Sequence, residues 1–117
     1  MMLRLLLSLV SVMLISSAAF AEPLVVIRTS MGDVTVSLDE VNAPITVANF
    51  LRYVDDDSYD NTIFHRVIAD FMIQGGGYYS DMSPAEEKGT IWNEADNGIK
   101  NLSGTISMAR MDAIDSA

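Results

Sequence analysis

Two short segments rich in β-branched and apolar residues, residues 62–68 and 71–74, restrict the fold of this chain more than any other feature. Only Ala69 and Asp70 separate them. Strand-like segments joined by so short a turn predict an antiparallel hairpin, because a parallel pair needs a long crossover. We therefore expect an antiparallel β structure that contains this hairpin.

A second hairpin is expected closer to the N-terminus. Residues 24–29 are β-branched and apolar, and residues 30–33 offer a turn in which Gly32 can adopt a positive φ. In residues 34–38, apolar and hydroxyl side chains alternate, which is the period of a half-buried strand. The two segments predict a strand, a tight turn and a second strand.

Residues 42–54 predict the main helix. Asn42 is a candidate N-cap, and Pro44 suits the first turn, where its missing N–H has no intrahelical partner. Apolar residues recur with helical spacing on one face, at Val47, Phe50, Leu51 and Val54. We expect this face to pack against the open end of a sheet.

The rest of the chain predicts less regular structure. Residues 75–88 are rich in Gly, Ser, Pro and charge, and we expect a loop there. Residues 93–101 are turn-like, and residues 104–110 are the last strand candidate. About five strands and one helix predict a mainly β, antiparallel fold of one domain.

Residues 1–21 have the pattern of a cleavable export signal. Arg4 precedes an apolar run, residues 5–15, and Ala19 and Ala21 place small side chains at the positions that a signal peptidase accepts. The alternative is a membrane anchor, but the run falls short of the roughly 20 residues that span a bilayer. We expect a signal peptide at 1–21, a mature domain at 22–117 and a periplasmic location.

The charge of the chain excludes some classes of partner. Loss of Arg4 with the signal reduces the basic residues from 7 to 6 against 16 acids, so the formal charge moves from −9 to −10. Such a chain repels nucleic acids and anionic membrane surfaces. The chain has no cysteine, which excludes disulfides, thiolate metal sites and lipid attachment to cysteine.

The hairpin at residues 62–74 carries the residues with the clearest chemical potential. It puts Arg66 and Gln74 on neighbouring strands, with Phe71 and Met72 between them. Arg66 shares its face with Phe64 and Ile68, and an arginine among apolar side chains is costly unless it is paired or reaches a groove. The alternative is an arginine whose stem is packed and whose head lies in water.

Other candidate sites are weaker. His65 is the sole histidine and faces away from Arg66, so a structural hydrogen bond is a better interpretation than catalysis. The glycines at 75–77 lack the remaining residues of a dinucleotide loop or a P-loop. The acidic segment 55–60 lacks the spacing of a calcium loop, and a solvated loop is the better interpretation.

Residues 64–68 (Phe-His-Arg-Val-Ile), followed by residues 71–76 (Phe-Met-Ile-Gln-Gly-Gly), resemble the signature of the cyclophilin family of prolyl isomerases. Further segments support the resemblance, which extends from about Leu24 onward and is strongest to exported bacterial members: residues 31–33, residues 44–50, and residues 93–94 before 104–109. It implies an eight-stranded antiparallel barrel capped by two helices, with proline-containing polypeptides as substrates, no cofactor and a monomeric state.

The resemblance also implies a role for individual residues. Arg66 would be the catalytic arginine, Phe71 and Met72 would line the pocket for the proline ring, and Gln74 would bind the substrate backbone. Ala109 and Arg110 would line the next part of the groove, although the family often has Asn where this chain has Arg110. Ala69-Asp70 departs from the common Pro-Gly, which changes a turn and leaves the groove intact.

The implied reaction fits these residue types, because isomerisation of an X–Pro bond needs a twisted amide and no nucleophile. The resemblance further implies that the chain stops before the fold is complete, with about five of eight strands and one of two helices. Three hypotheses follow: an isomerase that assists the folding of exported proteins, a non-catalytic module that binds proline-containing peptides, or an inactive fragment of the isomerase.

Overall fold

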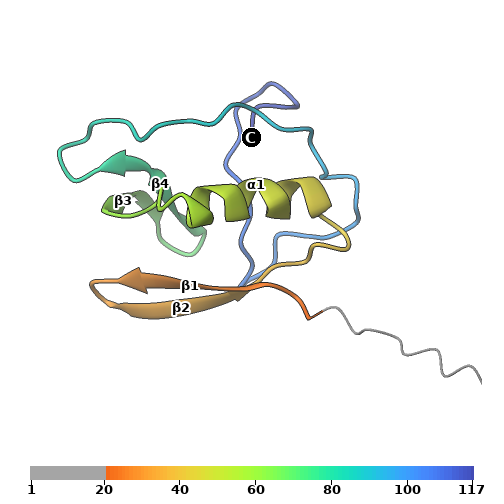
Figure 1. The fold of residues 1–117 in the computed structure, drawn as a ribbon, viewed down its shortest axis with the longest axis horizontal. Helices are drawn as coiled ribbons and strands as arrows, with labels where there is room; N and C mark the ends of the chain where they lie inside the picture. The colour runs from red at the N-terminus through yellow and green to blue at the C-terminus, as the bar shows by residue number, and fades with distance from the viewer. Residues whose placement is uncertain (1–20) are drawn as a thin grey trace, which may run out of the picture.

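The computed structural model describes residues 21–117, and the helix and strands of this part all lie before residue 80. Their order is β1 (Leu24–Thr29), β2 (Gly32–Ser37), α1 (Pro44–Asp55), β3 (Thr62–Ile68) and β4 (Met72–Tyr79) (Figure 1). The strands form two antiparallel pairs, β1 with β2 and β3 with β4. The expected mainly β, antiparallel class is confirmed.

The first hairpin has the expected strands with a tighter turn. Leu24 pairs with Ser37 and the register continues to Thr29 opposite Gly32, so β2 begins two residues before the expected start at Val34. Gly32 has φ 125°, a conformation that a side chain would make costly. The Thr29 hydroxyl donates to the Gly32 carbonyl at 2.7 Å, which closes the turn.

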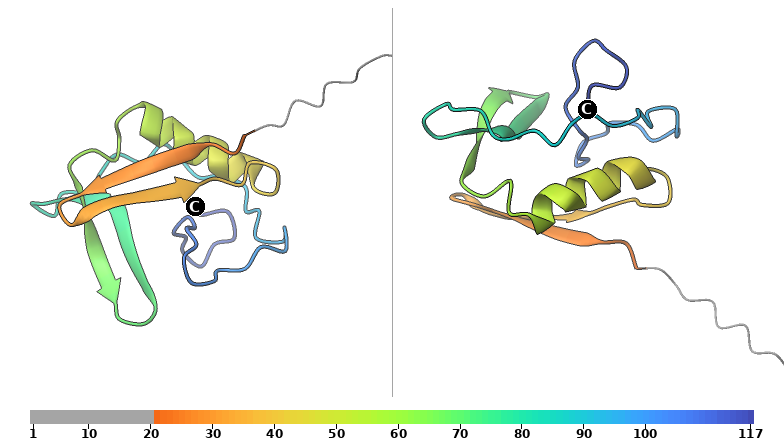
Figure 2. Two further views of the ribbon diagram at one scale, coloured as in Figure 1. Left: turned by 90° about the horizontal axis from the view of Figure 1, so that it is seen from below. Right: turned by 45° about the horizontal axis from the view of Figure 1, so that its top comes forward.

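Helix α1 lies across the β1–β2 hairpin (Figure 2) and forms the core with it. Among the described residues, the buried hydrophobic side chains are Val25, Leu38 and Val47. Each contributes about 1.5–3 kcal/mol by leaving water. The expected apolar stripe is confirmed, because Phe50, Leu51 and Val54 pack around these three.

The helix begins at Pro44, as its first-turn position predicted, but Asn42 is not its cap. The N-cap position is Ala43, which has no capping side chain, and Asn42 instead bonds Asp39 through its backbone and side-chain nitrogens at 3.0 and 2.8 Å. These two bonds, the side-chain one first, hold the pKa of Asp39 below its ordinary value. Asn42 therefore closes the turn before the helix.

Two expectations for the later chain are wrong. Residues 75–79 belong to β4 and not to a loop, because their backbone pairs with β3. Residues 104–110 form no strand, because no neighbouring segment pairs with them. Gly104 has φ 83°, and the Thr105 N–H donates locally to the Leu102 carbonyl at 3.2 Å. The described residues thus form four strands instead of about five.

The expected signal peptide falls on residues outside those described, apart from Ala21. Between residues 21 and 117, none of the helical structure combines the length and the apolar character that a membrane crossing requires.

Tyr59 connects the second hairpin to the helix. Its ring lies 5.3 Å from that of Phe50 and stacks on that of Tyr53 at 5.4 Å, and it also lies under Gly76 of β4. Burial, and to a lesser degree the neighbouring Tyr53, raises the pKa of Tyr59 to about 12.

The raised pKa of Tyr59 predicts that the fold loses stability as the pH rises. The neutral Tyr59 stabilises the fold fully below the unfolded value of about 10, and this contribution is lost as the pH rises from there through about 12. We expect an ultraviolet titration to show a phenol step near pH 12 that is missing in Tyr59→Phe and retained in Tyr79→Phe. All four tyrosines ionising together near pH 10 would contradict this packing.

Candidate active site

The β3–β4 hairpin closes through a three-residue turn, residues 69–71. Ile68 pairs with Met72, and the Phe71 N–H donates to the Ile68 carbonyl at 3.2 Å. Asp70 has φ 59°, a left-handed conformation that Asp adopts more readily than most residues. The expected turn is confirmed at Ala69 and Asp70 but extends through Phe71, which was expected to begin the second strand, and it fixes the register of the strands.

That register places Arg66 opposite Gln74. The Arg66 Nη1 donates to Gln74 Oε1 at 3.2 Å. Directly paired residues share a face, and so do residues two positions along each strand, which puts Ile68 and Met72 on the same face. Three of the expected site residues, Arg66, Met72 and Gln74, therefore lie together.

The remaining expected site residues are placed differently. Phe71 sits in the turn just before β4, with 76% of its surface exposed. Ala109 and Arg110 lie in the irregular segment after β4, and within residues 21–117 neither forms a hydrogen bond with the hairpin. The structure brings together the hairpin residues alone.

Glycines let the strands of this hairpin approach closely. A Cβ on Gly75 would lie 2.7 Å from Phe64 Cδ1, and one on Gly76 would lie 3.0 Å from the Tyr59 ring. Gly76 also has φ 86°. The register shifts on either side of Phe64, opposite Gly75, so these glycines mark a β-bulge that increases the local twist.

His65 contacts a different residue of β4 from Arg66. Its ring meets the Tyr78 ring edge-on at 4.7 Å, and its Nδ1 is buried with no hydrogen-bond partner among the described residues. A packing role fits this environment, and the expected hydrogen bond of His65 is not formed by Nδ1.

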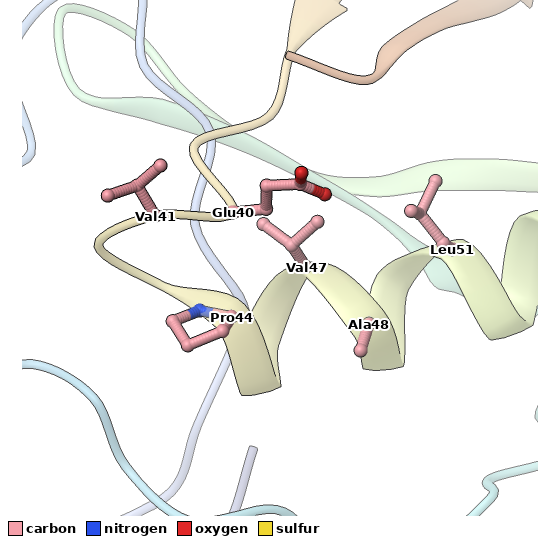
Figure 3. A pocket seen from close by; sticks show the side chains of 6 residues that line it. All are labelled: Glu40, Val41, Pro44, Val47, Ala48 and Leu51. Atoms are coloured by element: carbon pink, nitrogen blue, oxygen red, sulfur yellow. The ribbon is translucent and has the colours of Figure 1, made fainter. Parts of the chain in front are cut away.

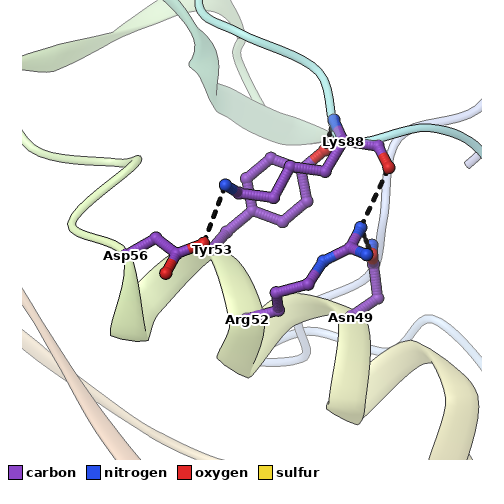
Figure 4. A network of polar contacts seen from close by, with 5 residues as sticks. All are labelled: Asn49, Arg52, Tyr53, Asp56 and Lys88. Atoms are coloured by element: carbon purple, nitrogen blue, oxygen red, sulfur yellow. Dashed lines mark hydrogen bonds and ion pairs between the residues drawn. The ribbon is translucent and has the colours of Figure 1, made fainter.

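A polar network holds the segment after β4 against the helix (Figure 4). Arg52 Nη2 donates to Asn49 Oδ1 at 2.9 Å and to the Lys88 carbonyl at 3.1 Å, while the Lys88 N–H donates to the Tyr53 hydroxyl at 2.6 Å. Lys88 Nζ lies 2.8 Å from Asp56 Oδ2, and this hydrogen bond, assisted by the Lys88 charge, lowers the pKa of Asp56.

Two open hollows of about 460 Å³ each flank helix α1. One is lined mainly by apolar side chains, among them Val41, Val47 and Leu51 (Figure 3), and the other extends to Arg52 and Ile91. Neither includes a residue of the Arg66 face. Within residues 21–117, no three acidic or histidine side chains gather in a way that could hold a metal ion.

The Arg66 face combines a cation with a neutral acceptor and apolar neighbours. A guanidinium has five donors in a fixed plane, and Gln74 accepts a hydrogen bond from one of its nitrogens. Such a group can donate to a carbonyl oxygen or to an amide nitrogen that has lost its conjugation. It supplies no nucleophile or general base.

Comparison with known proteins agrees with the signature on this hairpin. The family model described as "Cyclophilin type peptidyl-prolyl cis-trans isomerase/CLD" matches residues 24–117. The chain is 50% identical over 100 residues to peptidyl-prolyl cis-trans isomerase A of Dickeya dadantii, covering 86% of this chain and 53% of that protein. It is 49% identical over 94 residues to peptidyl-prolyl cis-trans isomerase B of Escherichia coli, covering 80% and 57%. The chain thus spans about half the length of the curated relatives it matches.

The bulge glycines give a stability prediction with a control next to it. Gly76→Ala should lower the free energy of unfolding by about 1–3 kcal/mol, because a side chain at this positive φ is strained, and its methyl would also crowd Tyr59. At Gly77 a methyl would meet His65 at 3.5 Å, an ordinary contact, so Gly77→Ala should cost about 0.5 kcal/mol or less. Urea denaturation measures both, and equal losses would contradict the assigned bulge.

Proposed function

The chain belongs to the cyclophilin type peptidyl-prolyl cis-trans isomerase family, and on this basis we propose that it accelerates the rotation of X–Pro bonds in polypeptides. The observation that carries the proposal is the placement of Arg66 beside Gln74 and Met72 on one face of the β3–β4 hairpin. The proposed substrates are proline-containing polypeptides, which need neither a cofactor nor a metal to isomerise.

The chemistry follows from the amide bond. Resonance gives the peptide bond a rotational barrier of about 18–20 kcal/mol, and rotation takes tens to hundreds of seconds for X–Pro. In the twisted state the prolyl nitrogen loses conjugation and gains a lone pair. Arg66 would donate to this nitrogen or to the adjacent carbonyl oxygen, and each 1.36 kcal/mol of selective stabilisation accelerates rotation about tenfold.

The neighbouring residues have supporting roles in the proposal. Gln74 accepts a 3.2 Å hydrogen bond from Arg66, would orient the guanidinium through it, and would also bind the substrate backbone. Phe71 and Met72 would hold the proline ring while the preceding carbonyl rotates. Ala109 and Arg110 would bind the polypeptide beyond that ring.

We further propose that the protein acts as a monomer on exported chains in the periplasm, after residues 1–21 are removed and residues 22–117 form the mature domain. The support is the charged, apolar and small-residue order of residues 1–21. The acidic composition, with 16 acids against 7 bases in the full chain, also favours polypeptide partners over nucleic acids.

A peptide-binding module without turnover is the second candidate. The observation that favours it is the openness of the Arg66 face: Arg66 is exposed and Phe71 is 76% exposed, so water reaches the guanidinium. Water weakens the electrostatic stabilisation that a closed pocket would give. An inactive fragment is the limiting case of the same argument.

Replacement of Arg66 separates these candidates. Arg66→Ala should lower kcat/KM for a short X–Pro peptide by about 10²–10³-fold, the usual effect of losing one donor to a transition state. Arg28→Ala, which removes an exposed arginine from the other hairpin, should leave the rate unchanged. Exchange spectroscopy by NMR measures cis-trans interconversion directly.

Three results would decide against the proposed activity or the role of Arg66. A wild-type chain that binds the peptide without accelerating interconversion supports the binding module. One that neither binds nor accelerates supports the inactive fragment. Full activity in Arg66→Ala contradicts the assignment of this residue.

Export has its own test. A periplasmic fraction should contain a protein whose N-terminal residue is Glu22, as measured by mass spectrometry. Leu7→Arg places a charge in the apolar run and should leave the full-length chain in the cytoplasm. Recovery of the wild-type chain from the cytoplasm with residues 1–21 intact would contradict the proposal.

A further inference from the structure

The first backbone N–H groups of helix α1 have no acceptor in the residues next to the helix start. The first N–H groups of a helix have no intrahelical acceptor. Pro44 has no N–H, Val47 N donates to Ala43 O at 2.9 Å, and Ala43 offers no capping side chain. The N–H groups of Ile45 and Thr46 are left, and no residue next to the helix start accepts them.

Glu94, which is 48 residues beyond Thr46, accepts both. Its Oε1 receives the Ile45 N–H at 3.1 Å, and its Oε2 receives the Thr46 N–H at 2.7 Å and the Thr46 hydroxyl at 2.8 Å. A carboxylate at this end also interacts favourably with the helix dipole. The cap that the local sequence lacks is supplied by a distant segment.

The environment of the Glu94 carboxylate favours its ionised form. Partial burial is the largest single influence and opposes ionisation, but the hydrogen bonds from Thr46 and Ile45 together outweigh it, so the pKa of Glu94 lies below its ordinary value. Glu94 is therefore ionised at neutral pH.

Hydrogen bonds continue from Glu94 to the end of the described chain. The neighbouring Asn93 donates from its backbone to Asp115 Oδ1 at 2.8 Å and from its side chain to the Ile114 carbonyl at 2.7 Å. Ser116 next to them accepts from the Met111 N–H at 2.8 Å. Met111 directly follows Arg110, so this path leads from the helix to the expected groove residues.

Asn97 makes a second contact between the segment that contains Glu94 and the residues just before α1. Asn97 Nδ2 donates to the Asn42 carbonyl at 3.0 Å, and its backbone N–H donates to the Glu94 carbonyl at 3.1 Å. The turn that follows Glu94 is thereby held against the residues just before α1. Glu94 and Asn97 attach one segment to one helix end at two points.

We propose that Glu94 is a positioning residue that, by capping α1, fixes the segment carrying Ala109 and Arg110 for polypeptide binding. The role of these two residues rests on the proposed function, whereas the anchoring of the segment does not. Glu94 touches no substrate in this proposal. It acts through Asn93, Asp115, Ser116 and Met111.

The test uses the whole chain and two independent readouts. The first is hydrogen exchange at the Ile45 and Thr46 amides and across residues 93–117. Glu94→Ala should accelerate exchange there by roughly tenfold, the usual scale of a lost helix cap, and Glu94→Gln, which keeps one acceptor oxygen, should have a smaller effect. Glu87→Gln removes an exposed charge from the chain between β4 and this segment and should change nothing.

The second readout separates positioning from a general loss of stability. Glu94→Ala should raise KM for an X–Pro peptide several-fold and change kcat by less than about twofold, because the Arg66 hairpin is retained. A variant that is only less stable would lose active molecules and show a lower kcat at an unchanged KM.

The outcomes distinguish this inference from the proposed function. Unaltered exchange in Glu94→Ala, or accelerated exchange with an unchanged KM, contradicts a positioning role. A wild-type chain without isomerase activity contradicts the proposed function. If exchange in Glu94→Ala is nevertheless accelerated, the anchoring of the segment stands, and the affinity for the peptide decides whether it serves binding.

Discussion

The packing of Val47 against Val25 and Leu38 holds α1 on the first hairpin, and the same helix contacts the second hairpin and the segment after it. The rings of Phe50 and Tyr53 pack against Tyr59, which lies just before the second hairpin. Arg52 and Tyr53 bind the backbone of Lys88, and the helix start binds Glu94. A 12-residue helix thus determines where both hairpins and the last segment lie.

Part of the proposed site depends on this arrangement and part does not. Its inner geometry is local, because the cross-strand pairing of Arg66 with Gln74 comes from the turn at Asp70 and the bulge at Gly75 and Gly76. The position of Ala109 and Arg110 is not set locally, because their segment is attached to the helix through the hydrogen bonds of Asn93 and Glu94. The hairpin residues of the proposed site and the pair Ala109 and Arg110 are therefore held by different sets of contacts.

The sequence was most informative where the signal is local. Alternation at Val34 and Val36, the short turn at Ala69 and Asp70, and the apolar spacing of α1 each predict an element from neighbours in the chain. The extension of β4 through Gly75 was missed, because its glycines have the composition of a loop but serve a close approach to Phe64. The strand expected at residues 104–110 was wrong, since a strand needs a partner and composition does not supply one.

For the site, pairing of Arg66 with Gln74 follows from strand register, whereas the contact of Glu94 with Thr46 spans 48 residues and has no local pattern.

The central claim is that a planar guanidinium, oriented by Gln74, stabilises an X–Pro amide as it twists. Arg66→Lys tests it most directly, because lysine keeps the positive charge and loses the fork of donors. Measured by NMR exchange on a short X–Pro peptide, the variant should retain less than about a tenth of the wild-type acceleration, a loss of about 1.4 kcal/mol or more. Wild-type acceleration in Arg66→Lys would show that charge alone suffices and would contradict the account.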